Sequence, residues 1–227
     1  MVCITGCNGF VGGYLFELLS KKTEDIVGID MSNDSALGLK DYRRLDISNV
    51  NQVYTQLEKW GVNEIYHLAA IANPRFASAH PLQAVRTNVM GCVSMYEYCR
   101  IHKDVRLLVV GTAVEYKRRT TRITETDALQ AGSIYGGTKM ASEIIGIQYV
   151  ETFGSSIVFT RSFNHSGPGQ STEYALANFA MQCAEIKLGL RDPIVEVGNL
   201  KAIRDFLDVR DVVKAYHLLC KNGTKGD

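Results

Sequence analysis

The sequence predicts an α/β fold in which a doubly wound parallel sheet carries helices on both faces. Two observations predict this class. Short apolar runs alternate with segments whose apolar residues recur at helical spacing, as repeated βαβ units require. The run 105–110 is almost entirely apolar, which is typical of a strand covered on both faces. Right-handed crossovers between such strands give a doubly wound sheet.

The first 161 residues supply most of the predicted elements. Apolar residues at helical spacing, such as Leu15, Leu18 and Leu19, indicate each helix, and compact apolar runs such as 26–29 indicate each strand. The predicted strands are 2–5, 25–30, 64–68, 105–110 and 156–161, and the predicted helices are 12–20, 50–60, 81–101 and 135–153.

The pattern becomes irregular beyond Arg161, where Gly, Pro, Ser and Asn are frequent. In this part we expect a loop at 164–172, a helix at 174–188, a strand at 194–197, a loop at 198–204 and a helix at 209–220. No final element follows before Asp227, so we expect the chain to be part of a longer protein.

The composition argues against several classes of protein. The 227 residues are 46% hydrophobic, and the net charge of +1 leaves no acidic or basic half, which disfavours binding to nucleic acid or to a membrane surface. No apolar stretch approaches the ~20 residues of a membrane helix, and the first residues do not form a signal peptide. Six scattered cysteines indicate free thiols, no metal site and a cytoplasmic protein.

A glycine-rich turn connects the first strand to the first helix. Gly6 permits a tight turn, Gly9 lets the backbone approach a pyrophosphate, and Gly12 lets the helix pack closely on the strand. The N–H groups and the positive dipole end of the helix then face the anion. The turn alone could be structural, but its context predicts a dinucleotide site. Three intervening residues are expected to line it: Asn8, Phe10 and Val11.

Two acidic residues follow at the ends of neighbouring segments. Asp30 ends its strand where a carboxylate accepts hydrogen bonds from a ribose 2′-hydroxyl and repels a 2′-phosphate. NAD is therefore favoured over NADP, although Asp30 could instead cap a turn. Asp46 and Ile47 are expected to line the adenine, although Asp46 could equally cap the next helix.

Tyr135 and Lys139 are four residues apart, so in a helix they project from one face. A nearby ammonium stabilises a phenolate and lowers the pKa of the phenol, which makes the tyrosine a better proton donor and acceptor near neutral pH. The same lysine could reach the nicotinamide ribose. Thr112 follows the strand 105–110, at the carboxyl edge where doubly wound sheets bind ligands, and could hydrogen-bond a substrate oxygen. This set predicts nicotinamide-dependent redox chemistry.

These residues resemble the extended short-chain dehydrogenase/reductase family of nucleotide-sugar epimerases, dehydratases and reductases. The resemblance covers essentially the whole chain. Besides the two patterns above, it rests on the segments 66–70, 87–91, 112–116, 161–170 and 204–211. The last two are most similar to those of reductases that act on GDP-4-dehydro-6-deoxy-D-mannose.

The resemblance implies a Rossmann-like cofactor domain over residues 1–162 and an incomplete substrate-binding portion over 163–227. It places Leu68, Ala69 and Ala70 near the cofactor, with Asn88 supporting the site. It also implies that Asn164 touches the substrate and that Arg204 holds its diphosphate. Alternatives remain open: a loop residue for Asn164, and a surface ion pair with Asp205 or Asp208 for Arg204. His67 is expected to be structural.

Departures from the family pattern narrow the chemistry. Family dehydratases carry acidic residues directly after the catalytic threonine, but here these positions are Ala113 and Val114, and Glu115 comes one later. Dehydration is therefore disfavoured. We expect a reductase of a 4-keto-6-deoxy nucleotide sugar that uses NAD, with NADP possible. The alternatives are a nucleotide-sugar 4-epimerase and a non-catalytic NAD-sensing regulator. The resemblance also implies a homodimer through helices 81–101 and 135–153.

Overall fold

The computed structural model describes residues 1–23 and 25–226. Its elements in chain order are β1 (Val2–Thr5), α1 (Phe10–Ser20), β2 (Ile26–Asp30), β3 (Asp41–Arg44), α2 (Val50–Trp60), β4 (Glu64–His67), α3 (Pro74–Ala79), α4 (Pro81–Val85), the π-helical turn η1 (Arg86–Met90), α5 (Gly91–Ile101), β5 (Arg106–Val110), the 3₁₀ turn η2 (Ala113–Glu115), α6 (Ile134–Phe153), β6 (Ser156–Thr160), β7 (Asn164–Ser166), α7 (Ala175–Lys187), β8 (Phe206–Asp208) and α8 (Val209–Asn222).

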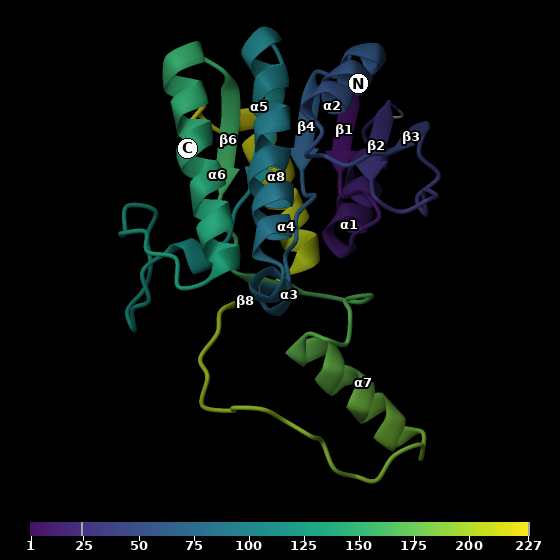
Figure 1. The fold of residues 1–227 in the computed structure, drawn as a ribbon. Helices are drawn as coiled ribbons and strands as arrows, with labels where there is room; N and C mark the ends of the chain where they lie inside the picture. Colours follow the sequence, from purple (N-terminus) through teal and green to yellow (C-terminus); the bar gives the residue numbers. More distant parts are fainter. Residues whose placement is uncertain (24, 227) are drawn as a thin grey trace.

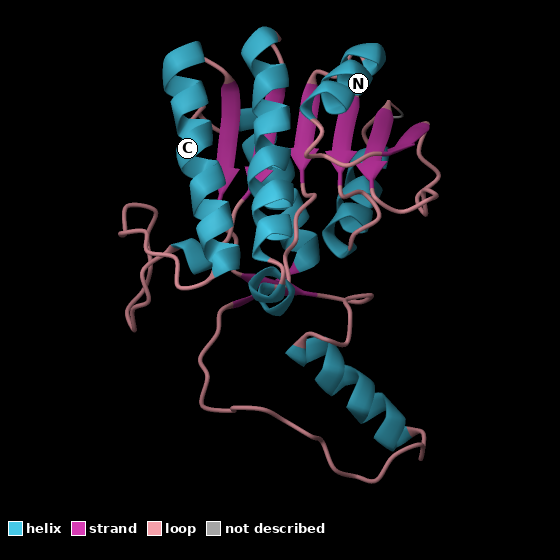
Figure 2. Ribbon diagram, in the orientation of Figure 1, coloured by secondary structure: helices cyan, strands magenta, loops and turns pink. Residues whose placement is uncertain are grey.

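Six parallel strands form the main sheet in the order β3-β2-β1-β4-β5-β6 (Figure 1). One hydrophobic cluster packs α2, α5 and α6 on one face, and a second packs α1 and α8 on the other. Figure 2 shows this three-layer arrangement of helices and strands. The predicted α/β class with a doubly wound parallel sheet is confirmed, and the strand order reverses between β1 and β4, where such sheets bind ligands.

Local signals account for the ends of the helices that matter most for the site. The Ser133 hydroxyl accepts a hydrogen bond from the Gly136 N–H at the start of α6, and Gly154 ends this helix in the left-handed conformation at φ 70°. Asn49 caps α2 in the same way, through the Gln52 N–H. The caps at Ser133 and Gly154 set the two ends of α6, and with them the positions of Tyr135 and Lys139 along this helix.

Several sequence predictions need correction. The predicted helix 81–101 contains the π-helical turn η1, and α3, β3 and η2 were not predicted. The predicted strand 194–197 is wrong. The Gln182 side chain donates to the Glu196 carbonyl oxygen and accepts from the Glu196 N–H, so this segment lies against α7 and pairs with no described strand. The predicted loop 164–172 contains β7, which pairs with β8.

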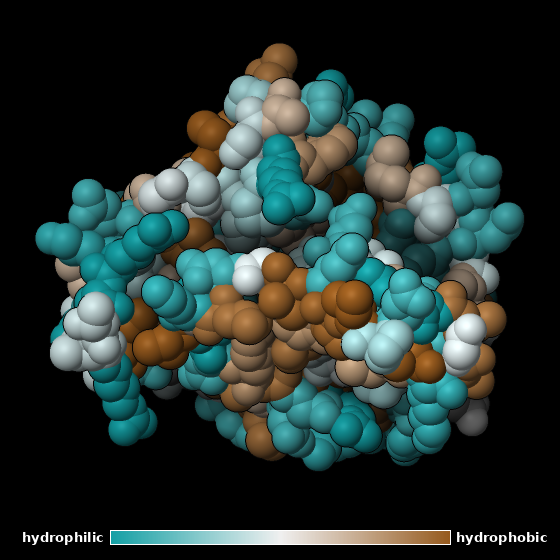
Figure 3. Space-filling view, turned by 90° about the horizontal axis from the view of Figure 1, so that it is seen from below, coloured by the Kyte–Doolittle hydropathy of each residue, from teal (hydrophilic) through white to brown (hydrophobic). Residues whose placement is uncertain are grey.

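The small sheet and α7 extend below the main sheet (Figure 1). Apolar side chains gather on the face seen from below, shown in Figure 3. This lobe exposes large apolar residues, among them Leu188, Leu190, Leu200 and Ile203. Among the described residues, none of the helices has both the length and the apolar character needed to cross a membrane.

Candidate active site

The glycine turn after β1 has the shape that the sequence predicts. Gly6 has φ +69°, and a Cβ there would lie 2.8 Å from the Ala69 nitrogen. A Cβ on Gly12 would lie 2.5 Å from the Cys7 carbonyl oxygen, so α1 packs directly on the turn. Gly9 is the N-cap of α1, where no described side chain caps the helix. The first N–H groups of α1 thus remain available to an anion.

Asn8 and Asp30 hold the turn against the segment that follows β2. The Asp30 carboxylate accepts hydrogen bonds from the Asn8 N–H at 3.1 Å and the Met31 N–H at 2.7 Å. The Asn8 side chain donates to Ser32 Oγ and to the Asp34 carbonyl oxygen. Asp30 therefore caps a turn, as the alternative interpretation of the sequence expects. It also lines a cleft at the carboxyl ends of the strands.

A cleft of about 630 Å³ lies at the carboxyl ends of β1, β2 and β4. It is lined by eight of the residues predicted to bind the cofactor: Gly6, Gly9, Asp30, Asp46, Ile47, Leu68, Ala69 and Ala70. The remaining lining residues were not predicted: Met31, Leu45, Ile71, Leu82, Gln83, Arg86 and Thr87. Five of these seven come from α4, η1 and the loop after β4, whose approach depends on tertiary packing.

Asp46 forms a turn at the edge of this cleft. Its carboxylate accepts from the Ser48 N–H at 2.9 Å and from the Ser48 hydroxyl at 2.8 Å. Helix α2 is capped by Asn49, so the predicted alternative role of Asp46 as the helix cap is replaced by a turn that precedes the helix. Ile47 is buried, and a Cβ on Gly91 would lie 3.0 Å from its Cγ1, so Ile47 packs on the start of α5.

Asn88 ties the loop after β4 to α6. Its side-chain oxygen accepts from the Ile71 N–H at 2.8 Å, and its amide nitrogen donates to the Ile71 carbonyl oxygen and the Thr138 hydroxyl. All three bonds are buried or partly buried. Asn88 therefore supports the cleft wall formed by Leu68, Ala69 and Ala70, and does not itself line the cleft.

Phe10 and Val11 are partly buried at the start of α1. Both pack against the hydrophobic cluster of α1 and α8, and the Phe10 ring meets Tyr14 edge to face at 5.5 Å. Neither borders the 630 Å³ cleft. Their side chains thus help to position α1, which presents its N–H groups to the cleft.

Tyr135 and Lys139 project from α6 beside the end of β5. Lys139 is buried, and its Nζ donates to the Val110 carbonyl oxygen at 2.7 Å. Burial raises the pKa of the Tyr135 phenol, a hydrogen bond with Thr112 acts in the opposite direction, and the charge of Glu115 raises it further. This direction is opposite to the one expected from the sequence, because burial is the largest influence on the phenol and the Lys139 Nζ bonds the Val110 carbonyl oxygen instead. The Tyr135 phenol therefore keeps its proton near pH 7.

Thr112 and Glu115 cap the 3₁₀ turn η2 reciprocally. The Thr112 N–H donates to Glu115 Oε1 at 2.6 Å, and the Val114 N–H approaches the Thr112 hydroxyl at 3.4 Å. Thr112 is buried at 8% exposure, whereas Val114 is exposed. The residues directly after Thr112 are apolar, and Oε1 of Glu115 bonds the main chain.

None of the three residues predicted to bind substrate lines the cleft, and two of them, Asn164 and Arg204, are exposed. Asn164 is exposed in β7, in register with Phe206 of β8. Arg204 is exposed, and its Nη1 donates to the neighbouring Ile203 carbonyl oxygen at 2.8 Å. Asp208 pairs with Arg210, not with Arg204. Neither Asn164 nor Arg204 lines the cleft.

His67 is buried at the end of β4 and bonds the Thr5 hydroxyl at 2.8 Å. Burial, followed by the charge of Lys139, lowers the pKa of His67 to about 3. The imidazole is therefore neutral near pH 7, which agrees with the structural role expected of it.

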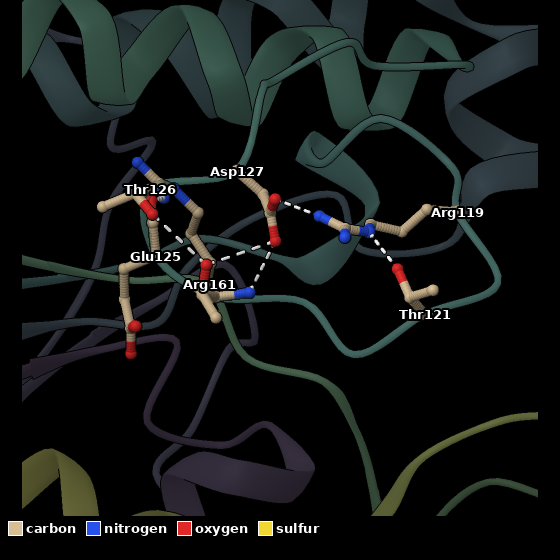
Figure 4. Close-up of polar contacts among 7 residues, drawn as sticks. Arg119, Thr121, Glu125, Thr126, Asp127 and Arg161 are labelled. Atoms are coloured by element: carbon tan, nitrogen blue, oxygen red, sulfur yellow. Dashed lines mark hydrogen bonds and ion pairs between the residues drawn. The ribbon is translucent and has the colours of Figure 1, made fainter.

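The loop between η2 and α6 is held by polar contacts (Figure 4). Arg119 pairs with Asp127 and donates to the Thr121 hydroxyl, and Asp127 also accepts from the Thr124 N–H at 2.7 Å. Arg161 donates to the Glu125 carbonyl oxygen at 3.0 Å. These contacts fasten the loop beside the first turn of α6.

The fold and the site together define a dinucleotide-binding α/β protein with a threonine, tyrosine and lysine at the carboxyl edge of its sheet. A family model described as GDP-mannose 4,6 dehydratase matches residues 3–227. The chain therefore belongs to this enzyme family, which has the extended short-chain dehydrogenase/reductase fold.

Two curated relatives illustrate the range of activities in the family. GDP-6-deoxy-D-mannose reductase of Pseudomonas aeruginosa is 26% identical, over 98% of this chain and 71% of the relative. An uncharacterized UDP-glucose epimerase of Bacillus subtilis, YtcB, is 28% identical, over 94% of this chain and 70% of the relative. Similar identities thus connect the chain to a reductase and to an epimerase.

Two solved structures are similar over nearly the whole chain. The structure of RMD from Pseudomonas aeruginosa complexed with NADPH has a TM-score of 0.86 at 26% identity, covering 100% of this chain and 74% of that one. The UDP-glucose 4-epimerase of Thermus thermophilus, in complex with NAD, has a TM-score of 0.83 at 23% identity, covering 96% and 74%. At 23% identity, the similarity to the epimerase structure shows that the two chains share a fold.

Proposed function

We propose that the protein is an NAD(P)H-dependent reductase of a 4-keto-6-deoxy nucleotide sugar, of the type that converts GDP-4-dehydro-6-deoxy-D-mannose to GDP-D-rhamnose. The observation that carries the proposal is the half-buried Tyr135 phenol, which is hydrogen-bonded to Thr112 at the carboxyl edge of the sheet and whose raised pKa keeps it protonated near pH 7. A protonated phenol is the group needed to neutralise an alkoxide as a ketone is reduced.

The described residues fit a nicotinamide dinucleotide. The cleft runs from the glycine turn to Asp30 and Ile47, and side chains at Gly6 or Gly12 would collide with main-chain atoms. The first N–H groups of α1 would hold the pyrophosphate, and Asp30 would accept the adenosine ribose hydroxyls. The bound cofactor supplies hydride to the carbonyl carbon.

The side chains of this chain then have separable roles. Thr112 orients the substrate oxygen, and Tyr135 donates the proton that the new hydroxyl requires. Lys139, whose Nζ is held by the Val110 carbonyl oxygen, supplies a fixed positive charge behind this pair. Ala113 and Val114 offer no acid or base at the positions directly after Thr112, which disfavours the removal of water from the sugar.

The experiment is incubation of the purified protein with GDP-4-keto-6-deoxymannose and NADH or NADPH, following absorbance at the nicotinamide band. We expect oxidation of the cofactor, lost in Tyr135→Phe and retained in Tyr149→Phe. Tyr149 lies on the same helix, and its hydroxyl bonds Glu97 at 2.6 Å, remote from Thr112. Conversion of UDP-galactose without consumption of NAD(P)H would refute the reductase.

A nucleotide-sugar 4-epimerase is the second candidate. The likeness to the Bacillus subtilis epimerase favours it, because the identity of 28% is similar to that of the reductase. An epimerase retains its cofactor through the reaction. Protein that carries bound NAD through gel filtration, and that isomerises a nucleotide sugar without added cofactor, would favour this function.

We also propose a homodimer formed by α4, η1 and α5 together with α6. These elements expose large apolar side chains, of which Val85 is 45% and Ile144 51% exposed. Light scattering should give the mass of a dimer, and Ile144→Glu should give a monomer because a charge at the contact is poorly tolerated. A monomeric native protein would refute the dimer.

A further inference from the structure

Glu115 is a fully buried carboxyl group directly beneath the candidate catalytic residues. Its Oε1 accepts the Thr112 N–H at 2.6 Å, and its own N–H donates to the Thr112 carbonyl oxygen at 3.1 Å. A Cβ on Gly111 would lie 2.6 Å from Oε1, so the carboxyl packs against the main chain. Its second oxygen, Oε2, is buried without a hydrogen-bond partner among the described residues.

Charged and titratable groups face this carboxyl from each neighbouring element. Helix α6 contributes Lys139 and Glu143, and Arg161 after β6 pairs with Glu143. The charge of Glu115 acts in turn on Lys139 and on two further groups, Cys92 of α5 and Tyr135 of α6. The carboxyl is therefore linked to Thr112 by a hydrogen bond and to Tyr135 by its field.

We propose that Glu115 is a positioning residue for the proposed reduction: its buried carboxylate fixes the main chain of Thr112, and with it the threonine hydroxyl beside Tyr135. The inference rests on the proposed function, since it assigns a supporting role to residues of that site. Glu115 acts through Thr112, because its bonded oxygen, Oε1, accepts from the Thr112 N–H.

The pH dependence follows from the sign of the charge. Burial raises the pKa of Glu115 to about 7, with Glu143 adding to the effect and Lys139 opposing it. Above this pH, the ionised carboxylate raises the pKa of Tyr135, so the phenol retains its proton further into the alkaline range. Neutralising Glu115 therefore lowers the pKa of Tyr135.

The test is a titration of the full protein carrying isotope-labelled tyrosine ring carbons, without substrate, followed by NMR and assigned with Tyr135→Phe. In the native protein, the Tyr135 resonance should show an inflection near pH 7, where Glu115 ionises. Glu115→Gln should remove this inflection and lower the Tyr135 midpoint by about half a pH unit or more.

Glu64→Gln is the matched control. Glu64 is also buried, but it begins β4 at the opposite edge of the sheet, where it accepts a hydrogen bond from Tyr66 and pairs with Lys221. This change should leave the Tyr135 titration as in the native protein. An equal shift in both variants would overturn the proposal, because the effect would then be a general loss of structure.

The titration separates this inference from the proposed function, because it needs no substrate. If the reductase assay succeeds, Glu115→Gln should also move the alkaline limb of the kcat/KM profile to lower pH. An unchanged Tyr135 titration in Glu115→Gln would refute the positioning role even in an active reductase. Should this variant not fold, the absence of an inflection near pH 7 in the native protein would refute it equally.

Discussion

Two adjacent glycines in α1 should respond to alanine with opposite signs. A Cβ on Gly12 would lie 2.5 Å from the Cys7 carbonyl oxygen and 2.8 Å from the Cys7 carbonyl carbon. Both are main-chain atoms of the cofactor turn and cannot rotate away. A Cβ on Gly13 would meet only Leu37 Cδ2 at 4.0 Å, which is ordinary contact. The two positions share a helix and differ in the space around them.

The magnitudes follow from these distances. Overpacking typically costs about 1–3 kcal/mol, so Gly12→Ala should lower the free energy of unfolding by that amount. For a chain of this size, each kcal/mol moves Tm by about 2–4 °C, which gives a loss of about 2–12 °C. Gly13→Ala should raise the free energy of unfolding by about 0.4–1 kcal/mol, because alanine restricts the unfolded chain.

Urea denaturation and thermal melting of both variants measure the stability, and quenching of NADH or NADPH fluorescence measures cofactor binding. Gly12→Ala should also weaken cofactor binding, since relief of the clash must move the turn that holds the pyrophosphate. Equal losses of stability in both variants would contradict the reasoning, and so would a Gly12→Ala protein as stable as the native one.

Three further predictions concern single side chains. Asn88→Ala should lower the free energy of unfolding by about 1–3 kcal/mol, because it leaves buried partners at Ile71 and Thr138 unpaired. Asn51→Ala, at an exposed position, is the control, and equal urea midpoints for the two variants would contradict the prediction. Burial lowers the pKa of His67 to about 3 in the folded protein, so below about pH 6.5 the unfolded chain binds a proton there that the folded protein does not. The free energy of unfolding should therefore decrease as the pH falls from about 6.5 to 3. His67→Gln should flatten that pH dependence in urea titrations, and an unaltered slope would speak against it. Asp30→Ala should favour NADPH over NADH by about tenfold relative to the native protein, since it removes the charge that repels a 2′-phosphate; unchanged relative affinities would exclude that role.

The sequence predicts the parts of the fold that depend on local pattern. Strands such as β5 are compact apolar runs, and α2 begins and ends where its periodicity does. β3 was missed because its residues 41–44 are Asp-Tyr-Arg-Arg, which carry no apolar signal at the edge of the sheet. The strand expected at 194–197 has the right residues but no neighbouring strand to pair with.

The residues of the site differ in the same way: those with a local role were predicted from the sequence, and those placed by tertiary packing were not. Gly6 and Gly12 were recognisable because their role depends on the local turn, and Asp30 because it ends a strand beside that turn. Gln83 and Arg86 border the cleft only because α4 and η1 fold over it, and no spacing in the sequence indicates that approach. The sequence shows that Glu115 follows Thr112 by three residues, but it does not show that the Glu115 side chain is buried.

The π-helical turn η1 makes the tolerance of the region between Pro81 and Ile101 to deletions depend on position. Its hydrogen bonds join residues five apart instead of four, so loss of one residue within 86–90 restores a regular α-helix while α4 and α5 keep their orientation. Such a deletion should leave Leu82 and Gln83 at the cleft wall and disturb only the bonds of Asn88 to Ile71. Loss of one residue within α5 instead turns the residues on one side of it by about 100°, and should pull one wall of the site away.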